Sequence, residues 1–239
     1  MPSAFPLLRR RGVKTLSLRQ YLIMSKKFLG YVAFFVVLAV GFYFVMTRLI
    51  PGYGDVKLPV QSSVRPFRFT NQDGQAVTER DVDGKVYLAG FFFTTCKSIC
   101  PVMNTNLMKV YEHFKNEPDF VIVSHTCDPE TDSVQRIKWY ADSLKVDTKR
   151  WWFLTGRKDS LYTAARISYL LDDPENNLKN LNDQFLHTQF FALVDKNGRV
   201  RKIYDGLKKE ELKELEADVP RLIREKTTKK PFANNLFGN

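Results

Sequence analysis

A run of uncharged, mostly apolar residues from Phe28 to Thr47 constrains this chain more than any other feature. As an α-helix rising about 1.5 Å per residue, the run would cross a hydrocarbon core of about 30 Å. Two lysines precede it, an arginine follows it, and no small-residue cleavage site comes next. We therefore predict a retained transmembrane anchor over residues 28–48, preceded by a basic segment over residues 1–27.

The formal net charge of +11 is concentrated in that basic segment. Before residue 28 the chain carries Lys and Arg but no Asp or Glu, whereas basic and acidic residues are interleaved along the rest. This asymmetry is typical of a leader rather than of a nucleic-acid-binding face, so we expect no nucleic-acid partner. The positive-inside bias predicts an N-terminus in the cytoplasm or matrix, with everything after Pro51 on the far side of the membrane.

Two locations satisfy this topology. The favoured one is the bacterial inner (cytoplasmic) membrane, with the C-terminal domain in the periplasm or extracytoplasmic space. The alternative is the mitochondrial inner membrane, with that domain facing the intermembrane space. Residues 1–23 are rich in Arg and free of acidic residues, as mitochondrial transit peptides are, whereas Met24 would itself start a compact bacterial anchor.

The remaining chain predicts a linker over residues 49–61, one domain over 62–228 and a flexible tail over 229–239. Within the domain, apolar runs of strand length alternate with segments of helical periodicity. This order predicts an α/β fold with a central sheet flanked by helices. The expected strands cover 85–93, 119–127, 150–156 and 188–206 besides a hairpin over 65–78, and the expected helices cover 101–114, 132–144, 159–171 and 208–226.

The first two buried strands each lead into residues that can do chemistry. In such sheets ligands gather at the carboxyl ends of the strands. If the two strands are adjacent and parallel, residues 94–100 and 125–130 share one edge of the sheet, and Cys127 and His125 become neighbours of the first two cysteines. The helix after the first strand has Pro101 in its first turn, and its expected apolar stripe is Val102, Leu107, Val110 and Phe114.

Cys96 and Cys100 form a C-x-x-x-C pair between a strand and a helix. Exported thiols normally oxidise to disulfides unless they are kept reduced for a purpose, and three cysteines cannot all pair internally. A structural disulfide across so short a loop would remove little chain entropy. A helix N-terminus favours the thiolate, which both attacks disulfides and binds soft metals. A redox couple and a metal site both stay open.

A soft metal such as Cu(I) prefers thiolates and accepts imidazole as a further ligand. The chain has three histidines. We expect His113 on the surface of a helix or in its packing, and His125 in a structural or supporting role. His187 directly precedes an apolar strand and follows a polar loop, which makes it the candidate for a third ligand.

Four stretches resemble the Sco/SenC family of membrane-anchored copper chaperones for cytochrome c oxidase: "FFFTTCKSICP", "SHTCDPETDS", "WWFLTG" and "FLHTQFFALVDKNGRVRKIYDG". Their order and separations are also similar to those of the family, over about residues 62 to 225. The resemblance implies a thioredoxin-like fold in which Cys96, Cys100 and His187 bind one copper ion, as Cu(I) or Cu(II).

The resemblance also bears on three neighbouring residues. Asp128 matches an acidic position of the family and is expected to support the ligands without binding the metal. Cys127 stands where relatives commonly carry an aliphatic residue, so we expect a small buried side chain beside the ligands; a third thiol within reach of the copper is the alternative. Leu186 stands where many relatives have Asp before the histidine.

Family members are thought to deliver copper to the dinuclear centre of oxidase subunit II, to reduce cysteines of that subunit, or both. We therefore expect a copper chaperone whose partner is cytochrome c oxidase subunit II or another copper or thiol client. The alternative is a membrane-anchored thiol–disulfide reductase in which Cys96 and Cys100 are the redox pair and His187 is dispensable. A peroxidase-like function is not favoured, because no arginine placed to polarise a peroxide is identifiable.

Overall fold

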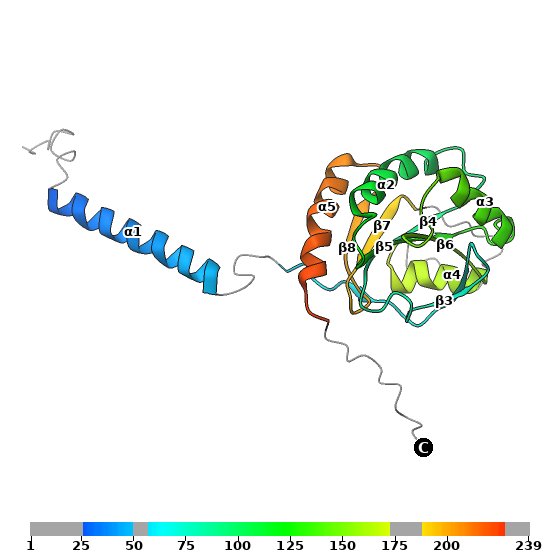
Figure 1. Cartoon of the computed structure of the whole chain (residues 1–239), viewed down its shortest axis with the longest axis horizontal. Coiled ribbons are helices and arrows are strands. Elements are labelled where there is room, and N and C mark those ends of the chain that lie inside the picture. The colour runs from blue at the N-terminus through cyan, green and yellow to red at the C-terminus, as the bar shows by residue number, and fades with distance from the viewer. Residues whose placement is uncertain (1–25, 50–56, 173–187, 228–239) are drawn as a thin grey trace, which may run out of the picture. The chain divides into compact units, whose positions relative to one another are not determined.

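The computed structural model describes residues 26–49, 57–172 and 188–227 (Figure 1). Contacts divide the chain into two units, Met1–Lys57 and Leu58–Asn239, which we describe separately. In the first unit, helix α1 spans Lys26–Leu49 and contains the apolar run. By length and composition α1 could cross a membrane, and its side chains from Lys26 to Val45 are exposed, as the predicted anchor requires.

A single eight-stranded sheet organises the second unit, in the order β1-β8-β7-β4-β5-β6-β2-β3. Strands β4, β5 and β6 are parallel neighbours, and the remaining pairings are antiparallel. The strands are β1 (Ser62–Ser63), β2 (Arg68–Asn71), β3 (Ala76–Thr78), β4 (Val86–Phe92), β5 (Phe120–Thr126), β6 (Trp151–Thr155), β7 (Phe190–Val194) and β8 (Arg199–Asp205).

The predicted strands and their connections are confirmed. Every residue of β4 and β5 is buried, as expected for strands covered on both faces. The hairpin of β2 and β3 turns at Gly74, and β7 and β8 are joined through Gly198; both glycines have a positive φ, which suits residues without a Cβ. The sequence pattern did not reveal that β2 would pair with β6.

Helices cover both faces of the sheet (Figure 1). Ser133 caps α3 by accepting a hydrogen bond from the Arg136 amide, while the expected third helix is α-helical only at first and continues as a π-helical turn, η2. The helices of this unit are α2 (Cys100–Phe114), α3 (Val134–Leu144), α4 (Lys158–Thr163), η2 (Ala164–Ser168) and α5 (Lys209–Arg224).

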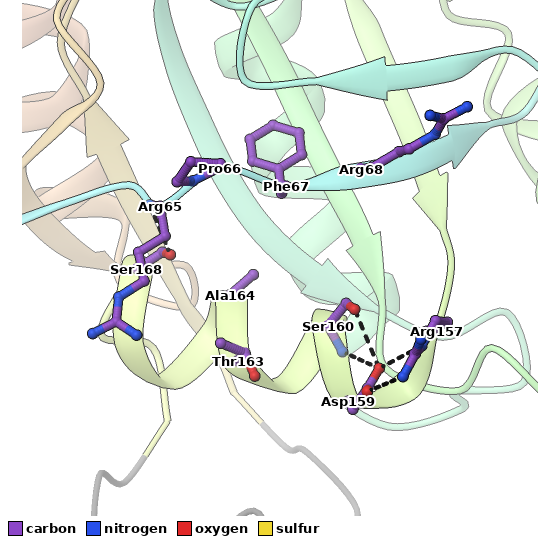
Figure 2. Close-up of a pocket in the computed structure, with 10 residues that line it drawn as sticks. All are labelled: Arg65, Pro66, Phe67, Arg68, Arg157, Asp159, Ser160, Thr163, Ala164 and Ser168. Atoms are coloured by element: carbon purple, nitrogen blue, oxygen red, sulfur yellow. Dashed lines mark hydrogen bonds and ion pairs between the residues drawn. The ribbon is translucent and has the colours of Figure 1, made fainter.

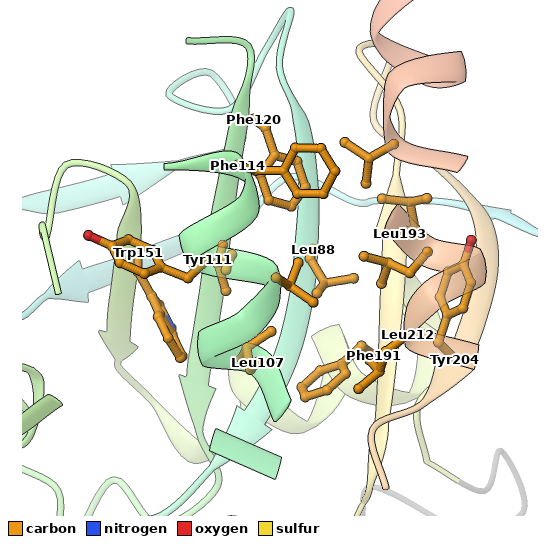
Figure 3. Close-up of a cluster of buried hydrophobic side chains, with 14 of the residues drawn as sticks. Leu88, Leu107, Tyr111, Phe114, Phe120, Trp151, Phe191, Leu193, Tyr204 and Leu212 are labelled. Atoms are coloured by element: carbon orange, nitrogen blue, oxygen red, sulfur yellow. The ribbon is translucent and has the colours of Figure 1, made fainter. Parts of the chain in front are cut away.

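The core lies in two clusters, one on each face of the sheet. Side chains of α2, α3 and α5 pack on one face, and Figure 3 shows part of this cluster. Residues of α4 and η2 pack on the other face. Three members of the expected stripe on α2 are buried, but Val102 is 51% exposed, so that part of the prediction is wrong. Met103 occupies the inward position instead, one residue further around the helix.

The start of this unit is fastened to the sheet by Arg201 of β8. Its guanidinium group donates two hydrogen bonds to the Leu58 carbonyl and forms ion pairs with Asp195 and with Glu225, the residue after α5. The Arg201 and Asp195 side chains are almost completely buried. Arg201 adjoins Val200, which pairs with Val194, a residue level with the start of β4. These contacts of Arg201, which we call the Arg201 clamp, therefore lie at the end of the sheet opposite the cysteines.

Candidate metal centre

Cys96 and Cys100 lie where the chain passes from β4 into α2. Cys96 is half-buried in the connecting loop, whereas Cys100 is the first residue of α2 and is 6% exposed. The Cys100 amide donates a hydrogen bond to the Cys96 sulfur over 3.4 Å. The Ser98 hydroxyl lies 3.7 Å from the same sulfur. Donors at a helix start thus converge on Cys96, and both thiols are free.

The two thiols of this pair are electrostatically unequal. Partial burial acts to raise the pKa of Cys96, but hydrogen bonds from Cys100 and Ser98 outweigh it, so the net pKa is lowered. Burial, reinforced by the hydrogen bond to Cys96 and by the charge of Cys96, raises the pKa of Cys100 to about 12. Cys96 is therefore the more acidic thiol of the pair, and Cys100 is the one that holds its proton more tightly.

Cys127 directly follows β5, and its position confirms the predicted meeting of strand ends. Phe92 and Thr126 pair as the last residues of β4 and β5. The Cys127 amide and thiol both donate hydrogen bonds to the Phe92 carbonyl, over 2.9 Å and 3.2 Å. Cys127 is 2% exposed, and burial, followed by the charges of Cys100 and Asp132, raises its pKa far above the usual range.

A narrow cavity of about 10 Å³ separates these buried thiols, which is room for about one water-sized atom. Cys100, Cys127 and Thr188 line it, together with Ile99 and the end of β4. Thr188 is the residue after His187, which itself lies outside the described residues. Within the described ranges, no three His, Cys, Asp or Glu side chains gather as a metal site, so two sulfurs are the donors visible here. Two soft sulfur donors at a partly exposed edge suit Cu(I).

The loop that carries Cys96 is held by a buried carboxylate that sequence reasoning missed, Asp132. Its two oxygens accept hydrogen bonds from the Thr94 amide and hydroxyl and from the Thr126 hydroxyl. Asp128, the acidic residue expected to support the ligands, lies at the preceding turn, where its carboxylate accepts a hydrogen bond from the Thr131 amide at 3.4 Å. Both residues occur in the stretch "CDPETD", but only the tertiary contact with Thr94 distinguishes them.

The two histidines among the described residues do not act as ligands beside the thiols. His125 is fully buried, with its ring stacked on Phe91 and its Nδ1 3.3 Å from the Gly90 carbonyl oxygen. Burial lowers its pKa to about 4, and Nε2 has no hydrogen-bond partner among the described residues. His113 is exposed on α2 beside Phe114. Both placements match the structural roles expected for them.

A larger hollow of about 410 Å³ lies between the segment entering β2 and the helical stretch of α4 and η2 (Figure 2). None of the cysteines lines it. Arg157 at its rim is paired with Asp159, and the side chains of Arg65 and Arg68 extend toward opposite ends of the hollow. Its cationic groups do not converge on a common point. Because no cysteine lines it, this hollow is separate from the thiol site.

Residues 57–224, more than half of the chain, match the sequence model of the family described as SCO1/SenC. The chain belongs to the SCO1/SenC family. A curated relative, the SCO1 protein homolog of Bacillus subtilis, is 33% identical over 172 residues, covering 70% of this chain and 86% of the relative. The thioredoxin-like fold expected from the resemblance is confirmed by solved structures of this family.

Two of these SCO1/SenC structures bear on the site. BsSco, described as a member of the Sco family of cytochrome c oxidase assembly proteins with a disulfide switch, is 32% identical with a TM-score of 0.61, covering 72% of this chain and 99% of BsSco. Arabidopsis thaliana ScoI was solved with copper bound; it is 25% identical with a TM-score of 0.52, covering 68% of this chain and 99% of ScoI.

Proposed function

We propose that this protein is a membrane-anchored copper chaperone that carries one copper ion on Cys96 and Cys100, with His187 as third ligand. The observation that carries the proposal is a pair of free thiols at a partly exposed edge of the sheet, held close by the hydrogen bond from the Cys100 amide to the Cys96 sulfur. A copper-bound structure in the same family supports the choice of metal. The client we propose is cytochrome c oxidase subunit II, or another copper or thiol protein.

The different exposure of the two cysteines indicates an order of transfer. Copper enters as cargo, replaces the thiol protons and is held by the two sulfurs. Cys96 is the more accessible ligand, so a client's sulfur or nitrogen reaches the copper on that side and displaces Cys96 first. Cys100 is buried under Ile99 and the end of β4, and it therefore releases the metal last.

The place of His187 in the chain supports its role as third ligand. Thr188 lines the small cavity beside Cys100, and His187 is its immediate neighbour in the sequence. Two thiolates alone can hold Cu(I), whereas Cu(II) needs more donors and a nitrogen-containing set. We therefore assign His187 the larger part in Cu(II) binding and the smaller part in Cu(I) binding.

A thiol–disulfide reductase is the second candidate, and the lowered pKa of Cys96 favours it. The Cys96 thiolate would attack a client disulfide and form a mixed disulfide, releasing the first client sulfur as a thiolate that takes up a proton. The Cys100 thiol would then lose its proton, attack the Cys96 sulfur and release the second client sulfur. The client ends as a dithiol and this protein as the Cys96–Cys100 disulfide.

We also propose that α1 holds the domain on the extracytoplasmic side of a bacterial inner membrane, because Lys and Arg gather before α1. The mitochondrial arrangement, with the domain in the intermembrane space, is the alternative. Reporter enzymes fused to the C-terminus test the side. Activity of a reporter that works only in the cytoplasm would refute both arrangements.

Anaerobic copper titration of the reduced full-length protein in detergent tests the chaperone function. Cu(I) affinity is measured by competition with a chelator, and Cu(II) binding by its sulfur-to-copper charge-transfer absorption. We expect His187→Ala to retain part of the Cu(I) affinity and to lose far more of the Cu(II) affinity. His113→Ala, which removes an exposed imidazole from α2, is the matched control and should bind like wild type. If His187→Ala binds both states like wild type, the third-ligand assignment fails and the reductase becomes the better candidate.

A further inference from the structure

Asp132 is the most completely engaged carboxylate near the thiols. It is fully buried, and its oxygens accept from the Thr94 amide at 3.2 and 3.3 Å, from the Thr94 hydroxyl at 2.5 Å and from the Thr126 hydroxyl at 2.5 Å. Thr94 lies two residues before Cys96, and Thr126 is the last residue of β5. One side chain therefore ties the start of the Cys96 loop to the neighbouring strand.

The donors around Asp132 leave its charge without a direct counter-ion. No ion pair found among the described residues includes Asp132. The nearest cation in this network is Arg136, whose Nε donates to the Thr94 hydroxyl at 3.1 Å, so Thr94 stands between the two charges. A carboxylate held by neutral donors in a protein interior exerts its charge on nearby groups more strongly than an exposed one.

We propose that Asp132 is a positioning residue of the thiol site that also sets the redox preference of the bound metal. Its hydrogen bonds to Thr94 fix the approach of the Cys96 sulfur to Cys100. Its buried negative charge stabilises Cu(II) relative to Cu(I), because the extra positive charge of Cu(II) gains more from a nearby anion. The metal part rests on the proposed copper binding, whereas the positioning part holds for the bare thiols as well.

Two substitutions separate the roles of the contact and of the charge. Asp132→Asn removes the charge and turns an amide N–H toward donors on Thr94 or Thr126, so it disturbs both roles. Thr94→Val removes the hydroxyl that donates to Asp132 and accepts from Arg136 but keeps the Asp132 carboxylate, so it tests the contact with the charge still in place. Asp142→Asn is the matched control, because Asp142 is an exposed carboxylate on α3 paired only with Lys138 in the described contacts.

The first measurement uses copper on the full-length protein in detergent. We expect Asp132→Asn to lower the ratio of Cu(II) affinity to Cu(I) affinity about tenfold, which raises the one-electron potential by about 59 mV. Thr94→Val should weaken both states by a similar factor and leave the ratio unchanged, and Asp142→Asn should match wild type. A wild-type ratio in a folded Asp132→Asn variant would overturn the charge role. If that variant does not fold, Asp132→Glu is used instead: this variant keeps the charge, so an affinity ratio shifted by as much as tenfold would overturn the same role.

The second measurement needs no metal. The equilibrium between the Cys96–Cys100 dithiol and its disulfide is measured in glutathione buffers of defined ratio. We expect the constant for disulfide formation to fall about tenfold in Thr94→Val and further in Asp132→Asn, because a loosened loop brings the two sulfurs together less often. A wild-type constant in Thr94→Val would overturn the positioning role. If wild type binds no copper while this constant shifts as expected, the proposed copper function fails and the positioning role stands.

Discussion

Strands β4 and β5 run side by side and end level with each other, yet the chain leaves them in opposite ways. Beyond β4 it enters a partly exposed loop in which donors converge on the Cys96 sulfur. Beyond β5 the first residue is the buried Cys127, whose thiol donates to the Phe92 carbonyl and accepts no hydrogen bond from any described residue. The same side chain therefore has a lowered pKa after one strand and a raised pKa after the other.

The difference shows that a position at the carboxyl edge of a sheet does not by itself make a side chain reactive. His125 and Cys127 share the edge with the C-x-x-x-C pair, but burial removes the stabilisation that a charged form needs. A helix start supplies that stabilisation to Cys96.

Removing either sulfur of the Cys96–Cys100 pair should abolish tight copper binding. Cys96→Ala and Cys100→Ala each leave one sulfur donor in the described site, which cannot hold Cu(I) between two thiolates. Chelator competition should show at least about a thousandfold loss of Cu(I) affinity, and Cys127→Ala should keep one copper per protein. Equal losses in all three variants would mean that the two strand ends form one site.

Alkylation should separate the thiols by rate. In the native reduced protein at pH 8, iodoacetamide should modify Cys96 at least about a hundredfold faster than Cys127, because the thiolate is the nucleophile and Cys127 is buried and protonated. Peptide mass spectrometry assigns the modified site, and denatured protein provides the control in which all cysteines react alike. Comparable alkylation rates of Cys96 and Cys127 in the native protein would contradict the difference between the two thiols.

Low pH should reduce the free energy of unfolding, because His125 in β5 is buried in its neutral form. Its folded-state pKa of about 4 lies below the ordinary value of 6.5, so the unfolded chain takes up the proton first. The contribution of neutral His125 is complete above about pH 6.5 and is lost as the pH falls toward 4, by about 3 kcal/mol. Urea unfolding of wild type across this range should show the loss, and His125→Leu should lack that part of the pH dependence. An equal pH dependence in both proteins would refute the assignment.

The smallest expected effect is that of Cys127→Ser. Burying a hydroxyl in place of the thiol should lower the free energy of unfolding by about 1–3 kcal/mol, while the copper stoichiometry stays at one. Cys96→Ser, at the half-exposed position, serves as the stability control and should change it less. Loss of copper binding by a folded Cys127→Ser variant would instead make Cys127 a ligand.

The meeting of the strand ends could be predicted from sequence because it follows from local patterns. Two continuous apolar runs, each followed by a helix pattern, specify parallel strands whose carboxyl ends share an edge. That logic placed Cys127 correctly beside the C-x-x-x-C pair. It could also place Pro101 in the first turn of α2, because the first turn of a helix is where proline costs least.

What the pattern could not supply depends on contacts between distant residues. Asp128 and Asp132 look alike in sequence. Only the contact with Thr94, 38 residues away, identifies Asp132 as the buried carboxylate that holds the Cys96 loop. Val102 stands five residues before Leu107 and is exposed, whereas Met103, four residues before Leu107, is buried on the inward face of α2. The pairing of β2 with β6 likewise depends on the completed sheet.

The Arg201 clamp has a mechanical consequence. Leu58 is the first residue of the domain unit. Its carbonyl accepts hydrogen bonds from the buried Arg201 guanidinium, which also forms ion pairs with Asp195 and Glu225. A pull on the anchor is therefore transmitted into β8 and the end of α5. The thiol loop begins at the other end of β4, five residues along the strand from Tyr87, or about 17 Å away. In the proposed membrane-anchored arrangement, tension from α1 therefore enters the sheet at the end opposite the two sulfurs and leaves their spacing unchanged.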